Sequence, residues 1–222
     1  MNIDSISYFK NYLKIICKSI FSENQGSRVW IERKIRVLYA IANCGIQQKD
    51  YELASNVLDQ VHDLEDSPES KAKVRSIQGG MFLQLGDLAA AVKFFEAAAA
   101  ERPAQSILET LIDQSCVSIA SNNYIEALEV LTKANEKAPH HSIVINNMSV
   151  CLLYLGRLKE ALSLLESNLT SNPEAFLQET QVLNLATLYE LESSYAGQKK
   201  QSLLDLLSRH AGDGFNTACL KF

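Results

Sequence analysis

The stretch Asn146-Asn-Met-Ser-Val-Cys-Leu-Leu-Tyr-Leu-Gly156-Arg-Leu-Lys-Glu-Ala161-Leu-Ser-Leu-Leu-Glu166 decides the fold of this chain. Two runs of apolar residues, spaced three and four positions apart as on one side of a helix, meet in it at Gly156. Glycine adopts the backbone conformations of a tight turn at low steric cost. The stretch therefore predicts two antiparallel helices, a helical hairpin, whose second helix ends before Pro173.

Three segments of the chain share one spacing: a turn residue, an alanine five positions later, a bulky apolar residue four after that, and a proline eight further on. The three sets are Gly86, Ala91, Phe95 and Pro103; Asn122, Ala127, Leu131 and Pro139; and Gly156, Ala161, Leu165 and Pro173. The prolines are 36 and 34 residues apart, close to the 34-residue period of the tetratricopeptide repeat. Alanine lets the paired helices approach closely, and proline ends the second one. We predict an all-α fold, a tetratricopeptide-repeat (TPR) α-solenoid of stacked antiparallel helix hairpins.

The array is expected to occupy residues 27–210. Gly79 stands where the pattern needs a small residue between paired helices, so close packing explains it. The last hairpin is predicted from two helical patterns, 176–194 and 198–209, and lacks the usual alanine and proline, as expected where a solenoid is capped.

Both ends of the chain are predicted to serve the array. Residues 1–26 carry one apolar stripe with lysines on other sides, which predicts an amphipathic helix that caps the first repeat. A helix lying on a membrane surface is the alternative interpretation. The apolar tail, residues 211–222, is expected to fold back on the array or to dock on a partner.

Composition limits the possible partners and the compartment. Twenty-six acidic and 21 basic residues give a net charge of −5 without a basic run, so we expect no nucleic-acid partner. The apolar runs fall short of the roughly 20 residues that span a bilayer, so we expect no integral membrane segment. The five cysteines show no paired spacing, which favours free thiols in a reducing compartment such as the cytoplasm.

The sequence offers no recognisable reaction centre. Its four histidines, His62, His140, His141 and His210, have no ligand partners at metal-binding spacing. It contains no glycine-rich phosphate loop and no nucleophile elbow. We therefore expect a protein that is not an enzyme, with no catalytic residue, no cofactor and no metal.

The repeat register predicts a protein-binding groove on the concave side of the array. Its residues come from two successive first helices, with two more from the tail: Ile112, Cys116, Ile119, Ile143, Asn146, Val150, Leu153, Tyr154, Phe215 and Leu220. An apolar groove of this kind suits a helix or an extended segment of a partner, or the chain's own terminus. Some of these residues could instead belong to the core. Chaperone cofactors of the same repeat class use basic side chains there to bind a C-terminal carboxylate, whereas this chain has Ile112 and Asp113.

The C-terminal half also resembles a narrower family. The residues that carry the likeness are 146–156, 184–185, 188–194, 198–201, 212–217 and 219–221, with weaker similarity at 37–40, 42–44 and 49–51. They are similar to the C-terminal region of the subunit-twelve family of the trafficking protein particle (TRAPP) complex. Relatives carry a long additional N-terminal region, so we expect a fragment or a short member of the family.

The resemblance implies a non-catalytic scaffold or adaptor subunit of a vesicle-tethering complex in transport between endoplasmic reticulum (ER) and Golgi apparatus. It implies a cytoplasmic location, peripheral to ER and Golgi membranes. The partners it implies are other subunits of a multisubunit trafficking complex, with an indirect link to a Rab-family GTPase through that complex. The alternative function is a TPR-type chaperone cofactor or peptide-binding adaptor outside membrane traffic.

Overall fold

The computed structural model describes residues 28–192, 195–210, 212 and 214–220 of the 222-residue chain. The chain divides into two units, Met1–Pro103 and Ala104–Phe222, which are described one at a time as the N-terminal and the C-terminal unit. Among the described residues there are helices and no strand, which confirms the predicted all-α class. The capping helix predicted at residues 1–26 lies outside the described residues.

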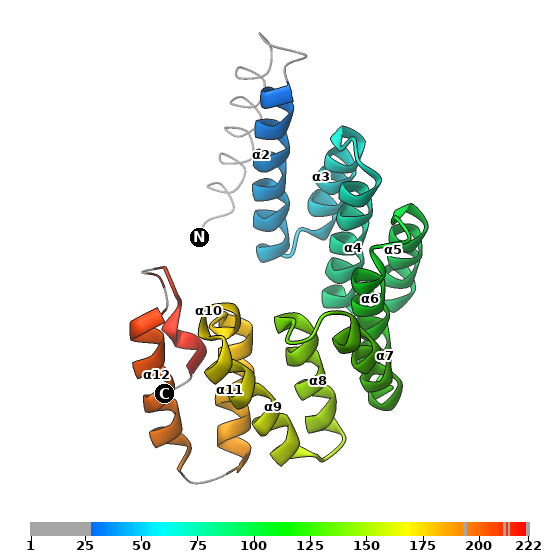
Figure 1. Ribbon diagram of the computed structural model, residues 1–222. Coiled ribbons are helices and arrows are strands. Elements are labelled where there is room, and N and C mark those ends of the chain that lie inside the picture. The colour runs from blue at the N-terminus through cyan, green and yellow to red at the C-terminus, as the bar shows by residue number, and fades with distance from the viewer. Residues whose placement is uncertain (1–27, 193–194, 211, 213, 221–222) are drawn as a thin grey trace. The chain divides into compact units, whose positions relative to one another are not determined.

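The described residues of the N-terminal unit form two helical hairpins (Figure 1). Their helices are α2 (Arg28–Gln47) with α3 (Tyr51–Leu64), and α4 (Pro68–Leu85) with α5 (Leu88–Glu101). The core of this unit contains Leu38, Ala42, Ala54, Val57, Leu58, Val61, Val74 and Met81. Ala54 and Leu58 are fully buried, so the alanine and the bulky residue of the repeat pattern occupy the interface between paired helices.

The helix starts follow from side chains that accept hydrogen bonds from free backbone N–H groups. Asp50 accepts from the Leu53 N–H at 3.1 Å and begins α3. Ser67 accepts from the Ser70 N–H at 3.0 Å. Pro68 takes the first helical position of α4, where no hydrogen bond within the helix needs the backbone N–H that proline lacks. These caps explain why the two helices begin at Tyr51 and Pro68.

Gly79 is a packing glycine, as predicted. A Cβ atom at this position would lie only 2.6 Å from Cε1 of the Phe95 ring, which belongs to α5. A Cβ atom at the adjacent Gly80 would meet no atom of the described residues within 4 Å. The absence of a side chain at Gly79 therefore lets α4 and α5 approach, with Phe95 filling the space.

The C-terminal unit begins with two regular hairpins. Their helices are α6 (Ile107–Ala120) with α7 (Tyr124–Lys137), and α8 (Ser142–Tyr154) with α9 (Leu158–Ser171). The repeat residues are buried as predicted: Ala127, Leu131, Ala161 and Leu165 are at most 2% exposed. Gly156 has a φ angle of +76°, a left-handed conformation that suits glycine, and it ends the first helix of its hairpin as predicted.

The last hairpin differs from its predicted boundaries. The sequence predicts one helix from Phe176, but the structure has a short turn, α10 (Pro173–Phe176), before α11 (Glu179–Glu192) and α12 (Ala196–His210). Leu177 leaves the helical conformation, with φ −80° and ψ 60°. This break lets both Phe176 and Leu177 reach the core, where they are 1% and 8% exposed. Burial of two adjacent side chains thus overrides helix continuity.

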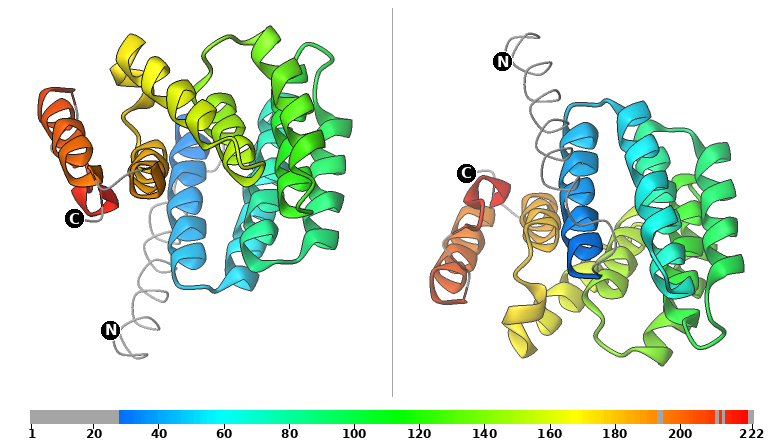
Figure 2. Two further views of the ribbon diagram at one scale, coloured as in Figure 1. Left: turned by 90° about the horizontal axis from the view of Figure 1, so that it is seen from below. Right: turned by 90° about the horizontal axis from the view of Figure 1, so that it is seen from above.

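The described part of the tail folds back on its own unit. It forms a short 3-10 helix, η1 (Thr217–Leu220), which contacts α11 and α12. Both views of Figure 2 show η1, in red, between these two helices. Leu220 is fully buried in the same core cluster as Leu185 and Leu203. The Asn216 N–H also donates to Glu179 Oε1 at 3.2 Å, at the start of α11. Of the two roles predicted for the tail, folding back is the one seen.

Candidate protein-binding face

Three first helices of the C-terminal unit repeat one exposure pattern. Along each, four residues at helical spacing are in turn exposed, half-buried, half-buried and exposed. These residues, called here the first-helix face, are Glu109, Asp113, Cys116 and Ala120 on α6; Ile143, Asn147, Val150 and Tyr154 on α8; and Thr180, Asn184, Thr187 and Leu191 on α11. Their shared spacing shows that equivalent sides of the three helices remain accessible in this unit.

Side-chain amides join α8 to α11 beneath this face. Asn184 Nδ2 donates to Asn146 Oδ1 at 2.8 Å, and Asn146 Nδ2 donates to Asn147 Oδ1 at 3.3 Å. Asn146 is buried, whereas Asn147 and Asn184 are half-buried. The buried amide fixes the register of the two helices, and its neighbours present amide groups to the surface.

A stacked pair of tyrosines forms one edge of the face. The rings of Tyr124 and Tyr154 are nearly parallel, with centroids 4.4 Å apart and planes at 4°. Tyr124 also donates from its hydroxyl to Asn122 Oδ1 at 3.0 Å, within the turn that joins α6 to α7. Tyr154 nevertheless stays 64% exposed. The stack holds a large amphipathic ring in place while leaving most of it accessible, which is a property of contact residues at protein interfaces.

The predicted site residues fall into three groups. Ile143 and Tyr154 are exposed, and Cys116 and Val150 are half-buried on the same face. Ile112, Ile119 and Leu153 are half-buried but pack against the apolar clusters of the unit. Asn146 and Leu220 are buried, and Phe215 is half-buried against the cluster that contains Leu220. The structure therefore brings part of the predicted set together at the surface and places the rest in the interior.

The pKa values of three groups near the face are raised, which keeps two thiols neutral and one amine charged at neutral pH. Burial, with a smaller contribution from the Asp113 carboxylate, raises the pKa of Cys116 to about 11, and burial raises the pKa of Cys151 to about 11. A hydrogen bond to Glu192 and the nearby Glu166 raise the pKa of Lys199. Nucleophilic cysteines and lysines need the opposite shift. These groups are therefore suited to structural roles.

Lys199 and Lys200 instead fasten α12 to its neighbours. Lys200 is buried and forms an ion pair with Glu190 of α11. Lys199 pairs with Glu192, lies 3.7 Å from Glu166 of α9, and its Nζ stands 4.8 Å from the centre of the Tyr189 ring. Burial and the Glu166 charge raise the pKa of Tyr189. The last hairpin, which lacks the repeat alanine, is thus held partly by charged contacts.

Comparison with known proteins gives two close sequence relatives. The chain is 37% identical over 206 residues to trafficking protein particle complex subunit 12 of Mus musculus, covering 90% of this chain and 25% of the relative. It is 38% identical over 200 residues to the protein of the same name from Homo sapiens, covering 87% of this chain and 27% of the relative. This chain is a homologue of a segment of subunit 12 of the trafficking protein particle complex.

The likeness to subunit 12 covers most of this chain but only about a quarter of the length of either relative. Within the shared segment, a sequence family described as tetratricopeptide repeat matches residues 118–176. That range contains α7, α8 and α9, and with them Tyr124 and Tyr154. The predicted TPR fold is therefore confirmed. Helix α8, which carries the middle row of the first-helix face, lies within the matched residues.

A solved structure supports the fold alone. The chain superimposes with a TM-score of 0.53 on the structure titled "Functional Characterization of Pseudomonas Aeruginosa pilF", at 19% sequence identity, covering 83% of this chain and 79% of that one. A likeness at this level of identity supports the helical-repeat architecture and gives no information about function.

Two parts of the face were not predicted from the sequence: the residues of α11, and the stacking of Tyr124 on Tyr154. Asn184 and Leu191 stand 37 residues after Asn147 and Tyr154, so the repeat spacing contains the signal. It was missed because the last hairpin lacks the alanine and proline that mark the register. The Tyr124 stack was missed because it joins two different helices, and no spacing along one helix reports it.

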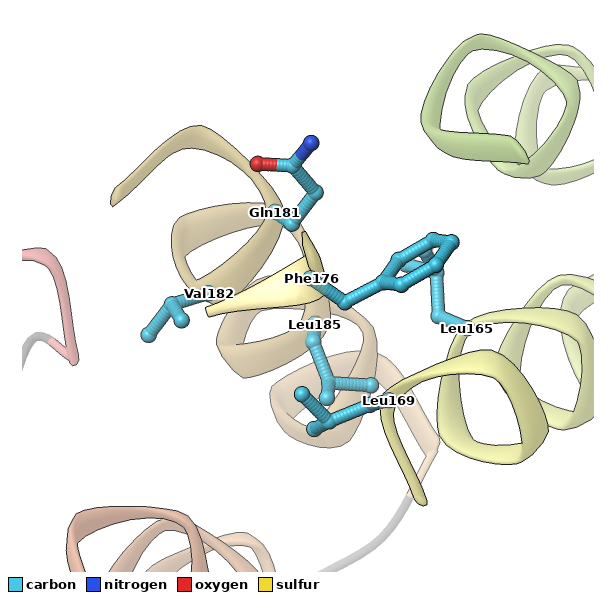
Figure 3. A pocket seen from close by; sticks show the side chains of 6 residues that line it. All are labelled: Leu165, Leu169, Phe176, Gln181, Val182 and Leu185. Atoms are coloured by element: carbon cyan, nitrogen blue, oxygen red, sulfur yellow. The ribbon is translucent and has the colours of Figure 1, made fainter. Parts of the chain in front are cut away.

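Two hollows in the described part of the C-terminal unit differ in size. Figure 3 shows an apolar cavity lined by Leu165, Leu169, Phe176, Gln181, Val182 and Leu185, with a volume of about 10 Å³, room for about one water molecule. The buried Gln181 Oε1 has no hydrogen-bond partner among the described residues. A wider groove of about 530 Å³ lies between α7 and α9, over Met148 and Leu152 of α8.

Three further properties concern the described residues as a whole. Within them, no group of three or more histidine, cysteine or acidic residues is arranged to hold a metal ion. None of the helices they form combines the length and apolarity needed to cross a membrane. The four cysteines they include, Cys44, Cys116, Cys151 and Cys219, are free thiols.

Proposed function

We propose that this chain is a non-catalytic scaffold subunit of a trafficking protein particle complex and that it binds other subunits through the first-helix face. The observation that carries the proposal is its 37% and 38% identity to subunit 12 from mouse and human over about nine tenths of the chain. A protein named as a subunit of a complex must present surfaces to neighbouring subunits. The proposal extends that requirement to the shared segment.

The first-helix face has the chemistry expected of such a surface. Ile143, Tyr154 and Leu191 are 46%, 64% and 57% exposed. Ile143 takes the first position of the repeated pattern on α8, and Tyr154 and Leu191 take the fourth position on α8 and α11. Aromatic and aliphatic side chains that are held rigidly but left accessible contribute strongly to interfaces because they lose little conformational freedom on binding. Amide groups of Asn147 and Asn184 add hydrogen-bonding capacity for the backbone of a bound segment.

The cellular setting belongs to the same proposal, and it rests on what the resemblance to the subunit-twelve family implies. We place this chain in transport between ER and Golgi apparatus, in the cytoplasm at the periphery of those membranes. Its link to a Rab-family GTPase is indirect, through the assembled complex. The tail contributes by completing the last hairpin, since Leu220 and Phe215 pack on the chain itself.

The contacts described above favour a binding role over a chemical one. The thiols of Cys116 and Cys151 have raised pKa values, and Lys199 is paired with glutamates. A peptide-binding chaperone cofactor is the alternative, and it needs basic side chains to hold a terminal carboxylate. Helices α6, α8 and α11 contain no lysine or arginine, which speaks against that alternative.

Affinity purification from cells tests the proposal. Tagged wild-type chain, Tyr154→Ser and Ile125→Ser would be compared by quantitative mass spectrometry of the recovered proteins. Ile125 is the matched control because it is 64% exposed, as Tyr154 is, but lies on the second helix α7. We expect wild type and Ile125→Ser to recover trafficking-complex subunits, and Tyr154→Ser to recover several-fold less of at least one of them.

Two results count against the proposal. If the wild-type chain recovers no trafficking-complex subunit, the scaffold role is wrong. If Tyr154→Ser recovers as much of every subunit as Ile125→Ser does, the scaffold role survives and the assignment of the first-helix face fails.

A further inference from the structure

Helix α9, a second helix of the array, presents a polar side over a hollow of about 580 Å³. Four residues that line this hollow stand four, three and four positions apart along α9, so they share one side of the helix. These residues, called here the α9 row, are Lys159, Ser163, Glu166 and Thr170. Glu166 is half-buried and the other three are exposed. The α9 row therefore forms an accessible surface that is separate from the first-helix face.

The C-terminal end of the α9 row carries an excess of negative charge. Lys199 forms an ion pair with Glu192, and its Nζ lies 3.7 Å from Oε1 of Glu166. Both glutamates line the hollow, so two carboxylates face one ammonium group there. A further cation at this end would balance the charge, because unlike charges across an interface favour binding.

The N-terminal end of the α9 row carries the opposite charge. Lys159 stands seven residues before Glu166, about 10.5 Å along the helix axis. That separation is too great for the two residues of one helix to form an ion pair, which needs about 4 Å between nitrogen and oxygen. The small side chain of Ser163 lies between them. Because its two ends carry opposite charges, the α9 row is complementary to a second copy of itself turned by 180°.

We propose that the α9 row is a site of self-association, where a second copy of this chain packs its own α9 antiparallel to the first. A two-fold axis close to Ser163 places Lys159 of each copy opposite Glu166 of the other, so two equivalent ion pairs form. A serine near the axis lets the two helices approach closely. A contact between single helices is small, so the association is weak and is lost on dilution.

Charge reversal tests this pairing. Lys159→Glu makes both ends of the α9 row acidic, and Glu166→Lys makes both ends basic. Each variant should stay monomeric, because like charges then face each other across the axis. A mixture of equal amounts of the two variants should dimerise, because the acidic row of one meets the basic row of the other. Sedimentation velocity of the full chain over a dilution series measures these samples and wild type.

Lys133→Glu is the matched control, since it reverses the same charge at an exposed lysine of α7. It should dimerise as wild type does, whereas each α9 variant should associate with itself at least about tenfold more weakly. Glu166→Lys also removes the contact with Lys199, so circular dichroism would compare the helix content of all variants. If Glu166→Lys loses helix, Lys159→Glu decides the test together with Ser163→Trp, which adds bulk near the axis without a charge and should also be monomeric.

Three results overturn the inference. They are a wild-type chain that stays monomeric throughout the dilution series, equal association of wild type and Ser163→Trp, and a mixture of two folded charge variants that remains monomeric. The proposed function is tested independently, because Tyr154→Ser changes the first-helix face and leaves the α9 row intact. Loss of dimers with normal recovery of trafficking-complex subunits, or the reverse, therefore shows which of the two proposals fails.

Discussion

The two units of this chain share their packing rules and differ in what their first helices present. In both, an alanine and a bulky apolar residue of the second helix are buried at the same spacing: Ala54 with Leu58, and Ala161 with Leu165. Yet α2 and α4 carry seven basic and two acidic residues, while α6, α8 and α11 carry five acidic and no basic ones.

This difference separates the residues that make the fold from those that make the binding surface. The positions between paired helices tolerate little change because close packing leaves no spare volume. The positions on the accessible side of the first helices are unconstrained by that packing and can take either sign of charge. The fold is therefore common to both units, and partner choice is expected to follow the first helices.

The largest expected effect comes from filling the space between paired helices. Ala161→Trp should destabilise the C-terminal unit by more than about 3 kcal/mol, because a fully buried alanine leaves no room for an indole. Ala54→Trp should do the same in the N-terminal unit, where Ala54 is equally buried. Urea unfolding followed by circular dichroism measures both. Lys159→Trp, at an exposed residue of α9, serves as the control and should change stability by less than about 0.5 kcal/mol.

If Ala161→Trp unfolds at the same urea concentration as Lys159→Trp, the hairpin does not pack through its alanines. If only one of the two alanine variants is destabilised, the packing rule does not hold in both units.

The next largest effect concerns the tail, which only the C-terminal unit contains. Leu220→Ala should reduce the free energy of unfolding by about 2–4 kcal/mol, because Leu220 is fully buried with Leu185 and Leu203. The measurement is chemical unfolding, with Thr217→Ala, an exposed residue of the same short helix, as control. A loss no greater than that of Thr217→Ala would mean that the tail does not close the core of the last hairpin.

Adjacent glycines in α4 should respond with opposite signs. Gly79→Ala should destabilise the N-terminal unit by about 1–3 kcal/mol, because the added Cβ would lie 2.6 Å from the Phe95 ring. Gly80→Ala should stabilise it by about 0.4–1 kcal/mol, because alanine favours the helix and the site is open. Thermal unfolding of the two variants gives the answer. Effects of the same sign would show that α4 and α5 do not meet at Gly79.

The smallest effect concerns the turns, where the two units again differ. Lys49 and Gly156 occupy equivalent turn positions, with φ angles of +60° and +76°. Lys49→Gly should stabilise the N-terminal unit by less than about 1 kcal/mol, because relief of left-handed strain is offset by the greater freedom of glycine in the unfolded chain. Gly156→Ala should destabilise the C-terminal unit by about 1 kcal/mol. Thermal unfolding would contradict this account if both changes were neutral.

The hairpins could be predicted from sequence because their signals are local. The spacing from Gly156 to Ala161, Leu165 and Pro173 is set by one helix and its two ends, and burial of Ala161 and Leu165 confirms it. The caps at Asp50 and Ser67 are equally local.

Features that depend on contacts between distant residues could not be predicted in the same way. The break at Leu177 is decided by core space for Phe176 and Leu177, which no helical pattern reports. The Tyr124–Tyr154 stack and the Asn146–Asn184 hydrogen bond join different helices. Eight of the ten predicted groove residues are only partly accessible or buried for the same reason. Helical spacing predicts the side of the helix on which a residue lies, but not which other elements cover that side.

Hydroxyl-radical footprinting of the purified complex tests the central claim most directly, because it reports the exposure of individual side chains. Tyr154 and Leu191 of the C-terminal unit should become several-fold less reactive when the chain is bound to its partner subunits, while Val29 of the N-terminal unit, 52% exposed, should keep its reactivity. Unchanged reactivity at Tyr154 and Leu191, with protection confined to α2 and α4, would contradict the account.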